Sequence, residues 1–325
     1  MIRKRTMVVV GIVCVFLTIA VLSSTRAYAQ NWKPEKTIRM IVSDGPGTRY
    51  DIEARVLTSS LIETLGVPVI VDNVTGGGQL VGTLKAYKSK PDGYTLLFTS
   101  SSSMLLNQMI QGAPYDFAKF EFLAQVVDTE KTWSTVATTK GLDSWEDVLK
   151  LDRPFRWGTV GKGTVSYVAP VVVSAAFNLK AIYSTAYSGA EFVPAAMRGE
   201  VDGVIPPLGL VEPFYRDGNL NMLFFLSGVR NPKYPDIPCV ADLGHPEVND
   251  ANVGYHVACA PPGTPKNIVD TLSEALYKAC SADSSKQLQA RFGNPGAWKP
   301  APGSEVRANL ENQWKLLQKY APLLK

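Results

Sequence analysis

Short apolar stretches alternate with helical stretches in the part of the chain that follows residue 37. Residues 38–42, 67–71 and 94–98 are short and apolar, which is typical of buried strands. Residues 52–65 and 80–89 lie between them and carry apolar side chains at helical spacing. This alternation predicts βαβ units and a mostly parallel sheet, so the fold class is α/β.

Three loops of similar composition connect predicted strands to predicted helices, at residues 45–51, 99–103 and 158–164. Glycine, serine and threonine predominate in them, so backbone N–H groups and hydroxyls are accessible at the start of the next helix. The helix macrodipole adds about half a positive charge there. Ligands of open α/β sheets bind beyond the carboxyl ends of the strands, where these loops lie. The sequence therefore predicts capture of a small acidic molecule.

The remaining chain predicts a second α/β lobe. Extended stretches at 122–127 and 133–138 carry the chain into it, and a stretch at 255–260 brings the chain back. The other predicted elements are helices at 143–151, 166–177, 190–197, 266–280 and 304–319 and strands at 155–157, 181–183 and 201–205. We expect residues 30–131 plus 253–325 to form lobe 1 and residues 132–252 to form lobe 2. Each lobe has a mixed, mostly parallel sheet, and a cleft lies between the lobes.

The first 29 residues have the layout of a secretory signal. Arg3, Lys4 and Arg5 precede an apolar stretch at 7–22, and the small residues that follow predict cleavage after Ala29. An uncleaved membrane anchor stays open. The segment holds four basic residues and no acidic ones, whereas the whole chain has 33 Lys+Arg and 29 Asp+Glu, so the mature chain is neutral. An exported protein is expected, without a basic surface for nucleic acid.

Sequence motifs for catalysis or cofactor binding are missing. No Gly-x-Ser-x-Gly occurs, and residues 77–83 lack the lysine of a phosphate-binding loop. His245 and His256 are assigned ordinary structural or surface roles, and no His, Cys and carboxylate cluster has metal-ligand spacing. We expect no catalytic residue, no metal and no cofactor. Three cysteines of the mature chain are expected to be small buried side chains, with one disulfide left open: Cys239, Cys259 and Cys280.

Ordered motifs along nearly the whole mature chain match a known family. The matching segments are Trp32-x-Pro34, Pro46-Gly47 with Asp51 and Ala54-Arg55, Leu65-Gly66-x-Pro68-Val69, Asp72-Asn73 with Gly76 to Gly78, Pro91-Asp92-Gly93-Tyr94-Thr95-Leu96-Leu97, Pro114-Tyr115-Asp116, Gly161-x-Gly163-Thr164, Tyr187-Ser188-Gly189, Gly199-Glu200-Val201-Asp202 and Ala260-Pro261-Pro262-Gly263-Thr264-Pro265. With these segments the chain resembles the Bug-type periplasmic substrate-binding proteins of tripartite tricarboxylate transporters.

The resemblance implies a bilobed, type II-like periplasmic-binding-protein fold that closes on an organic carboxylate like a Venus flytrap. It also implies delivery of that ligand to the permease subunits of a membrane transporter. Family members hold carboxylates through backbone amides, hydroxyls and bridging waters. A monomer in the periplasm is expected. Two alternatives stay open: a ligand sensor that docks on a signalling partner, and a periplasmic enzyme that acts on a carboxylic acid.

The first loop departs from the family pattern, which has glycine and small or apolar residues where this chain has Thr48, Arg49 and Tyr50. Arg49 either donates to a ligand carboxylate or faces solvent, and both roles stay open. Tyr50 either stacks on an aromatic ligand or packs under the loop. In the second lobe Pro206 and Pro207 remove backbone donors. These departures favour a bulky or aromatic carboxylate.

Predicted ligand contacts lie in the three loops and in one turn of the second lobe. They are Gly47, Thr48, Arg49, Tyr50, Ser101, Ser102, Gly161, Gly163, Thr164, Tyr187 and Ser188. Residues predicted to shape the site are Pro46, Asp51, Gly189, Asp202 and Pro206. For Thr164 and the serines, a plain N-cap of the following helix is the alternative. Asp51 is expected to hold its loop, because a carboxylate in contact with the ligand would repel it.

Overall fold

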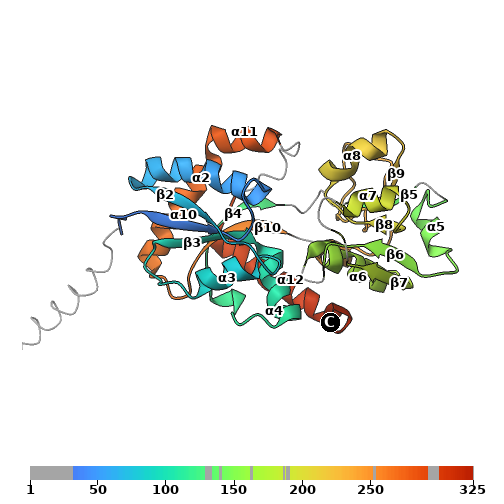
Figure 1. Ribbon diagram of the computed structural model, residues 1–325, viewed down its shortest axis with the longest axis horizontal. Helices are drawn as coiled ribbons and strands as arrows, with labels where there is room; N and C mark the ends of the chain where they lie inside the picture. The colour runs from blue at the N-terminus through green and yellow to red at the C-terminus, as the bar shows by residue number, and fades with distance from the viewer. Residues whose placement is uncertain are drawn as a thin grey trace, which may run out of the picture.

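The computed structural model describes residues 32–128, 134–138, 141–161, 164–185, 187, 191–251, 254–291 and 300–324. They form two α/β lobes that lie side by side (Figure 1). Each lobe has its own mixed sheet, which confirms the expected fold class. The predicted signal segment, residues 1–29, lies outside the described residues, and so do the predicted lobe boundaries at 131/132 and 252/253, which stay predictions.

Lobe 1 contains a six-stranded sheet with the order β11-β4-β10-β3-β1-β2. Its strands are β1 (Ile38–Val42), β2 (Val69–Asn73), β3 (Thr95–Ser100), β4 (Glu121–Asp128), β10 (Tyr255–Ala260) and β11 (Ala301–Pro302). β1 pairs in parallel with β2 and β3, whereas β10 runs antiparallel to β3 and β4. Every residue of β10 is buried. The sheet thus joins strands from both ends of the described chain.

Helices cover this sheet, and two of them begin at the same edge. The helices are α2 (Arg49–Leu65), α3 (Leu80–Tyr87), α4 (Ser101–Gln111), α10 (Lys266–Ser281), α11 (Asp283–Arg291) and α12 (Gly303–Leu324), with the short 3-10 helix η1 (Phe117–Lys119). α2 follows β1 and α4 follows β3, and these two strands are parallel neighbours. The N-termini of α2 and α4 therefore lie at one edge of the sheet.

Lobe 2 contains a five-stranded sheet with the order β7-β6-β8-β5-β9. Its strands are β5 (Ser134–Thr138), β6 (Phe155–Gly158), β7 (Ala181–Ser184), β8 (Gly203–Val204) and β9 (Leu220–Phe225). Its helices are α5 (Trp145–Leu149), α6 (Val165–Ala176), α7 (Phe192–Met197), α8 (Leu208–Arg216) and α9 (Glu247–Ala251). β6 is parallel to β7 and β8, and β5 is antiparallel to β8 and β9.

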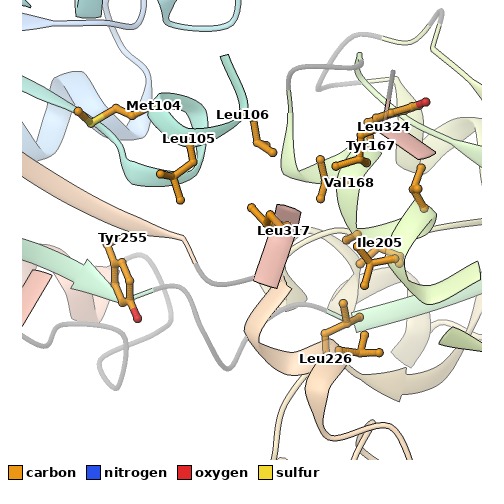
Figure 2. Close-up of a cluster of buried hydrophobic side chains, with 14 of the residues drawn as sticks. Met104, Leu105, Leu106, Tyr167, Val168, Ile205, Leu226, Tyr255, Leu317 and Leu324 are labelled. Atoms are coloured by element: carbon orange, nitrogen blue, oxygen red, sulfur yellow. The ribbon is translucent and has the colours of Figure 1, made fainter. Parts of the chain in front are cut away.

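One hydrophobic core continues from lobe 1 into lobe 2. It includes Leu105 and Leu106 of α4, Val168 of α6, and Leu317 and Leu324 of α12. Figure 2 shows the end of α12 between side chains of the two lobes. Two further clusters lie within single lobes, one between the first sheet, α2 and α10 and the other around β8, β9 and α7. Helix α12 therefore packs against both lobes and connects their cores.

Buried thiols complete the interior of both lobes. Cys239, Cys259 and Cys280 are buried, which confirms the expectation of small buried side chains, and no disulfide joins them within the described part of the chain. Burial raises the pKa of Cys280 to about 12, so this thiol stays protonated at neutral pH.

Among the helices in the described part of the chain, none is both long enough and apolar enough to span a bilayer.

Candidate functional site: a cleft between the lobes

A cleft of about 330 Å³ lies between the two lobes. Lobe 1 contributes the first turn of α2, the start of α4 and the beginning of β10, and lobe 2 contributes the starts of α6, α7 and α8. The lining residues are Arg49, Tyr50, Ser100, Ser103, Gly254 and His256 from lobe 1 and Val160, Thr164, Val165, Ser166, Phe192, Pro207 and Leu210 from lobe 2. Helix N-termini from both lobes thus line one cavity.

The first loop is held in place by its own side chains. Gly47 has a φ of 78°, a left-handed conformation that favours glycine. Thr48 is the N-cap of α2: its Oγ1 accepts from the Asp51 N–H at 3.5 Å and donates to the Gly45 carbonyl at 2.8 Å. Asp51 Oδ2 accepts from the Gly47 N–H at 2.9 Å. These contacts therefore shape the loop. Four predicted site residues belong to it without lining the cleft: the exposed Pro46, Gly47, Thr48 and Asp51.

Arg49 and His256 meet at a buried carboxylate behind the lobe-1 wall. Glu53 is fully buried, and its Oε1 accepts from Arg49 Nε at 2.8 Å. Its Oε2 lies 2.5 Å from His256 Nδ1, a residue 203 positions away in the sequence. Burial raises the pKa of Glu53, but His256 and Arg49 together outweigh it and leave the pKa lowered. An ionised Glu53 therefore positions both Arg49 and His256 at the cleft.

Tyr50 packs on the same cluster. Its ring lies 4.1 Å from the His256 ring at an interplanar angle of 33°, and 6.2 Å from the ring of Phe98. Burial is the largest influence on its hydroxyl and raises the pKa of Tyr50 to about 12. The phenol therefore stays protonated and keeps a proton to donate at neutral pH. Tyr50 both packs under the loop and lines the cleft.

Ser100 and Ser103 line the cleft at the second loop. Ser100 is the N-cap of α4, and its side chain accepts from the Ser103 N–H at 3.5 Å. Of the two predicted contacts, Ser101 is fully buried and its Oγ accepts from the Tyr255 N–H at 2.9 Å, and Ser102 is also buried. The structure therefore brings the flanking serines to the cleft and directs Ser101 towards β10.

Thr164 alone of the predicted second-lobe contacts lines the cleft among the described residues. It is the N-cap residue of α6, but its side chain makes no capping hydrogen bond. Gly161 precedes it with a φ of 153°. Tyr187 packs against the core cluster of lobe 2. Three predicted residues lie outside the described part of the chain: Gly163, Ser188 and Gly189.

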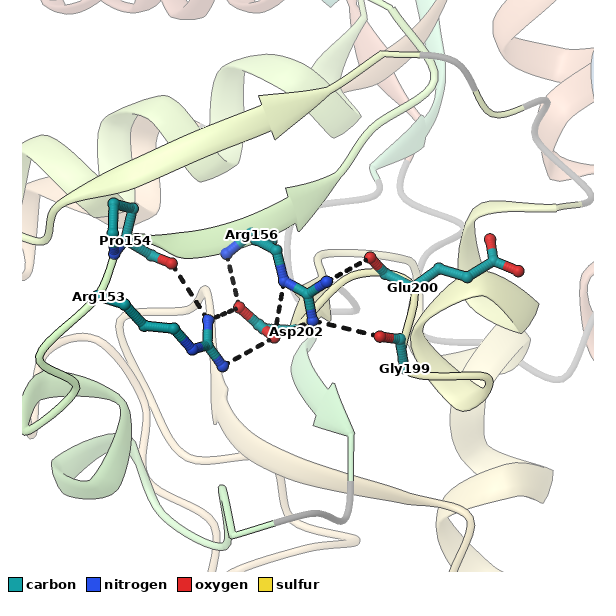
Figure 3. A network of polar contacts seen from close by, with 6 residues as sticks. All are labelled: Arg153, Pro154, Arg156, Gly199, Glu200 and Asp202. Carbon is teal, nitrogen blue, oxygen red and sulfur yellow. Dashed lines mark hydrogen bonds and ion pairs between the residues drawn. The ribbon is translucent and has the colours of Figure 1, made fainter.

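The buried carboxylate of Asp202 lies in an ion-pair network with two partly exposed arginines, away from the cleft lining (Figure 3). Its Oδ2 lies 2.5 Å from Arg153 Nη1, and its Oδ1 lies 2.7 Å from Arg156 Nη2. The Arg156 backbone N–H donates to Oδ2 at 2.9 Å. The network holds the bend that precedes β8 against strand β6. Pro206 follows β8 and is buried, whereas its neighbour Pro207 lines the cleft.

Most of the apolar wall was not predicted from the sequence. Phe192, Leu210 and Val160 come from three separate segments of lobe 2 and meet only in the folded chain. His256 was assigned an ordinary structural role, and its nearest carboxylate partner, Glu53, lies far away in the sequence. Over the residues that the structure describes, no group of three or more His, Cys, Asp or Glu side chains is arranged to hold a metal ion.

Two α/β lobes with an intervening cleft define a solute-binding protein, and comparison with known proteins gives the family. Residues 53–300 match the model described as the tripartite tricarboxylate transporter family receptor. The chain is 30% identical to protein BugT of Bordetella pertussis over 307 residues, which cover 90% of this chain and 89% of BugT. The chain thus belongs to the TctC family of non-enzymatic, periplasmic solute-binding receptors, as its motifs indicated.

Solved structures show the same fold. MatC from Rhodopseudomonas palustris with bound malate is 20% identical, with a TM-score of 0.69 over 90% of this chain and 100% of MatC. A second R. palustris protein, with adipate, is also 20% identical, with a TM-score of 0.71 over 90% of this chain and 98% of that protein. These likenesses extend over both lobes, so the cleft lies within a shared architecture.

Proposed function

We propose that the protein captures an organic carboxylate between its two lobes and delivers it to the permease of a tripartite tricarboxylate-type transporter. One observation carries the proposal: the N-termini of α2 and α4 in lobe 1 and of α6 in lobe 2 line the same cleft. Each helix N-terminus favours an anion through its backbone N–H groups and its dipole. An anion in this cleft interacts with both lobes at once.

Two further observations support a carboxylate as the anion. Arg49 lines the cleft, and its guanidinium offers the planar donor geometry that matches a carboxylate. The related R. palustris proteins hold malate and adipate, both of them carboxylates. The family description supports the transporter as the partner. The proposal also includes export with cleavage after Ala29, lobe boundaries at 131/132 and 252/253, and a monomeric state.

A ligand screen tests the proposal. The full chain is expressed with its own leader, and the processed protein is purified from the periplasm. Mass spectrometry of this protein is expected to give a chain that begins at Gln30. A thermal-shift panel of aliphatic and aromatic mono-, di- and tricarboxylates is expected to raise the melting temperature for one class of acid. Folded protein that binds no member of the panel contradicts carboxylate capture.

A further inference from the structure

The two walls of the cleft differ in chemistry. The lobe-1 wall is polar and carries Arg49, His256, Ser100 and Ser103. The lobe-2 wall consists mainly of apolar side chains, those of Val160, Val165, Phe192, Pro207 and Leu210. A ligand that fills this cleft therefore meets a charged, hydrogen-bonding surface on one side and a hydrocarbon surface on the other.

The charge of the lobe-1 wall can balance at most one carboxylate. Arg49 carries one positive charge, and the buried Glu53 behind it carries one negative charge. His256 contacts the other oxygen of Glu53 and adds at most one more positive charge. The three side chains together thus carry between zero and one net positive charge, so the cluster can neutralise at most one ligand carboxylate. A second carboxylate needs a partner elsewhere.

The hydroxyls of the lobe-2 wall are already used as donors. Thr164 Oγ1 donates to the Gly161 carbonyl at 2.7 Å. Because that bond uses its proton, the 2.7 Å contact between Thr164 and Ser166 has the Ser166 hydroxyl as donor. Ser166 Oγ also accepts from the Val160 N–H at 3.1 Å. Neither hydroxyl therefore has a proton left for an anion in this arrangement.

Resting on the proposed function, we infer that the ligand is a monocarboxylate with an apolar body, bound with its carboxylate at Arg49 and its body against Phe192 and Leu210. A second carboxylate at the far end of the ligand would lie against this apolar wall, where the described residues offer it helix N-termini but no cationic side chain to compensate for its lost hydration. The cleft volume of about 330 Å³ is at the small end of the range for ligand pockets, which suits a compact acid.

Two sets of matched ligands test the inference by calorimetry on the processed protein. Hexanoate, adipate and hexanamide share six carbons and carry one, two and no carboxylates. Benzoate, terephthalate and benzamide repeat the series on an aromatic ring. We expect the monocarboxylate of at least one set to bind at least about tenfold tighter than its dicarboxylate and its amide, since one lost charged contact is worth about a factor of ten or more.

The outcomes separate this inference from the proposed function. Tighter binding of adipate or terephthalate overturns the inference and leaves carboxylate capture intact. The same holds if no monocarboxylate of the wider panel binds but a dicarboxylate or a tricarboxylate does. If no carboxylate binds to folded protein, both proposals are overturned. Stronger binding of the amides than of the acids also overturns both proposals.

A pair of leucine variants tests the orientation of the ligand. Leu210 lines the cleft and is 51% exposed, so Leu210→Lys leaves the core intact and places a positive charge on the lobe-2 wall. We expect adipate to gain about tenfold in affinity relative to hexanoate. Leu149→Lys is the control, because Leu149 is similarly exposed at 46% and does not line the cleft. An unchanged ratio of adipate to hexanoate affinity in Leu210→Lys overturns the orientation.

Discussion

At the scale of single residues, two buried carboxylates have similar partners and different positions. Glu53 contacts Arg49 and His256 at the cleft, and Asp202 contacts two arginines inside lobe 2. A buried charge is tolerated only when such partners compensate for its lost hydration. Glu53 therefore acts on the ligand site through Arg49 and His256, whereas Asp202 acts on the stability of the lobe.

The Asp202 network predicts a pH-dependent loss of stability in Asp202→Asn. We expect the free energy of unfolding at pH 7 to fall by about 1 to 3 kcal/mol, the usual effect of losing charged hydrogen bonds. Burial raises the pKa of Asp202, but hydrogen bonds from Arg156 and Arg153 outweigh it and lower the pKa. The stabilisation is therefore complete above the unfolded pKa of about 3.9 and is lost as pH falls through the lower folded pKa. Urea unfolding at several pH values measures the difference.

Glu200→Gln is the matched control for this prediction. Glu200 pairs with Arg198 on the surface of the same turn, where both side chains are substantially exposed. Exposed pairs are screened by solvent and contribute little. We expect no measurable change in stability from Glu200→Gln. An equal loss in the two variants, or a loss in Asp202→Asn that does not diminish as pH falls below the unfolded pKa of about 3.9, would contradict the role assigned to the Asp202 network.

At the scale of secondary-structure elements, the close approach of α3 to the chain just after β1 and β2 requires glycine. A Cβ at Gly82 would lie 2.7 Å from the Val74 carbonyl oxygen and 2.8 Å from Ser43 Cα, both of them backbone atoms. Alanine is favoured over glycine in a helix by about 1 kcal/mol, but a clash with backbone outweighs that preference. We expect Gly82→Ala to destabilise the protein by about 1 to 3 kcal/mol in chemical denaturation.

Gly209→Ala separates the clash from the helix preference. Gly209 lies in α8, and a Cβ there meets no atom within 4 Å. The variant is expected to be as stable as the wild-type protein or more stable by up to about 1 kcal/mol. Destabilisation of both variants to the same extent would show that the close approach at Gly82 is not the cause.

The alternation of strands and helices was predictable because local periodicity determines it. The strands expected at 38–42 and 255–260 have the expected bounds, and the one expected at 94–98 begins one residue later and ends two residues later. α8 was missed, because its short sequence contains Pro213 and follows two prolines. The strand expected at 201–205 is shortened to Gly203–Val204, because the preceding residues form the bend that Asp202 anchors to β6.

The cleft was only partly predictable, because local sequence patterns indicate local structure and not contacts between distant segments. Arg49, Tyr50 and Thr164 line it and lie in loops with a recognisable composition. Ser101 and Ser102 were chosen from a run of four serines, but the geometry of the N-cap directs Ser100 and Ser103 to the cleft. The apolar wall depends on contacts between distant segments, which no local pattern records.

At the scale of the whole molecule, the shared core predicts that the lobes unfold together. Leu324 is fully buried at the end of α12 and packs in the cluster that includes Tyr167 and Val168 of lobe 2. We expect Leu324→Ala to cost about 2 kcal/mol and to separate the single calorimetric transition into two. Leu323→Ala is the control, because the side chain of Leu323 is next in the sequence to Leu324 and is 56% exposed. We expect its free energy of unfolding to change by no more than about 0.5 kcal/mol. Two transitions in the wild-type protein would contradict the coupling.

A cleft lined by both lobes also predicts that a ligand closes the molecule. A ligand shifts an equilibrium between open and closed forms only through contacts that it makes better in one form. Arg49 on lobe 1 and Phe192 on lobe 2 can contact one small ligand together only when the lobes are close. We expect small-angle X-ray scattering to give a smaller radius of gyration with the best carboxylate of the panel than without it.

Arg49→Gln decides whether the compaction depends on the lobe-1 contact. With the same ligand concentration, this variant is expected to keep the radius of gyration of the ligand-free protein, because the charged contact that favours the closed form is lost. At a concentration raised to saturate the variant, the compaction should return if the apolar wall still draws the lobes together. An unchanged radius of gyration for saturated wild-type protein would mean that the lobes are fixed, since the core shared through α12 would then hold one arrangement with and without ligand.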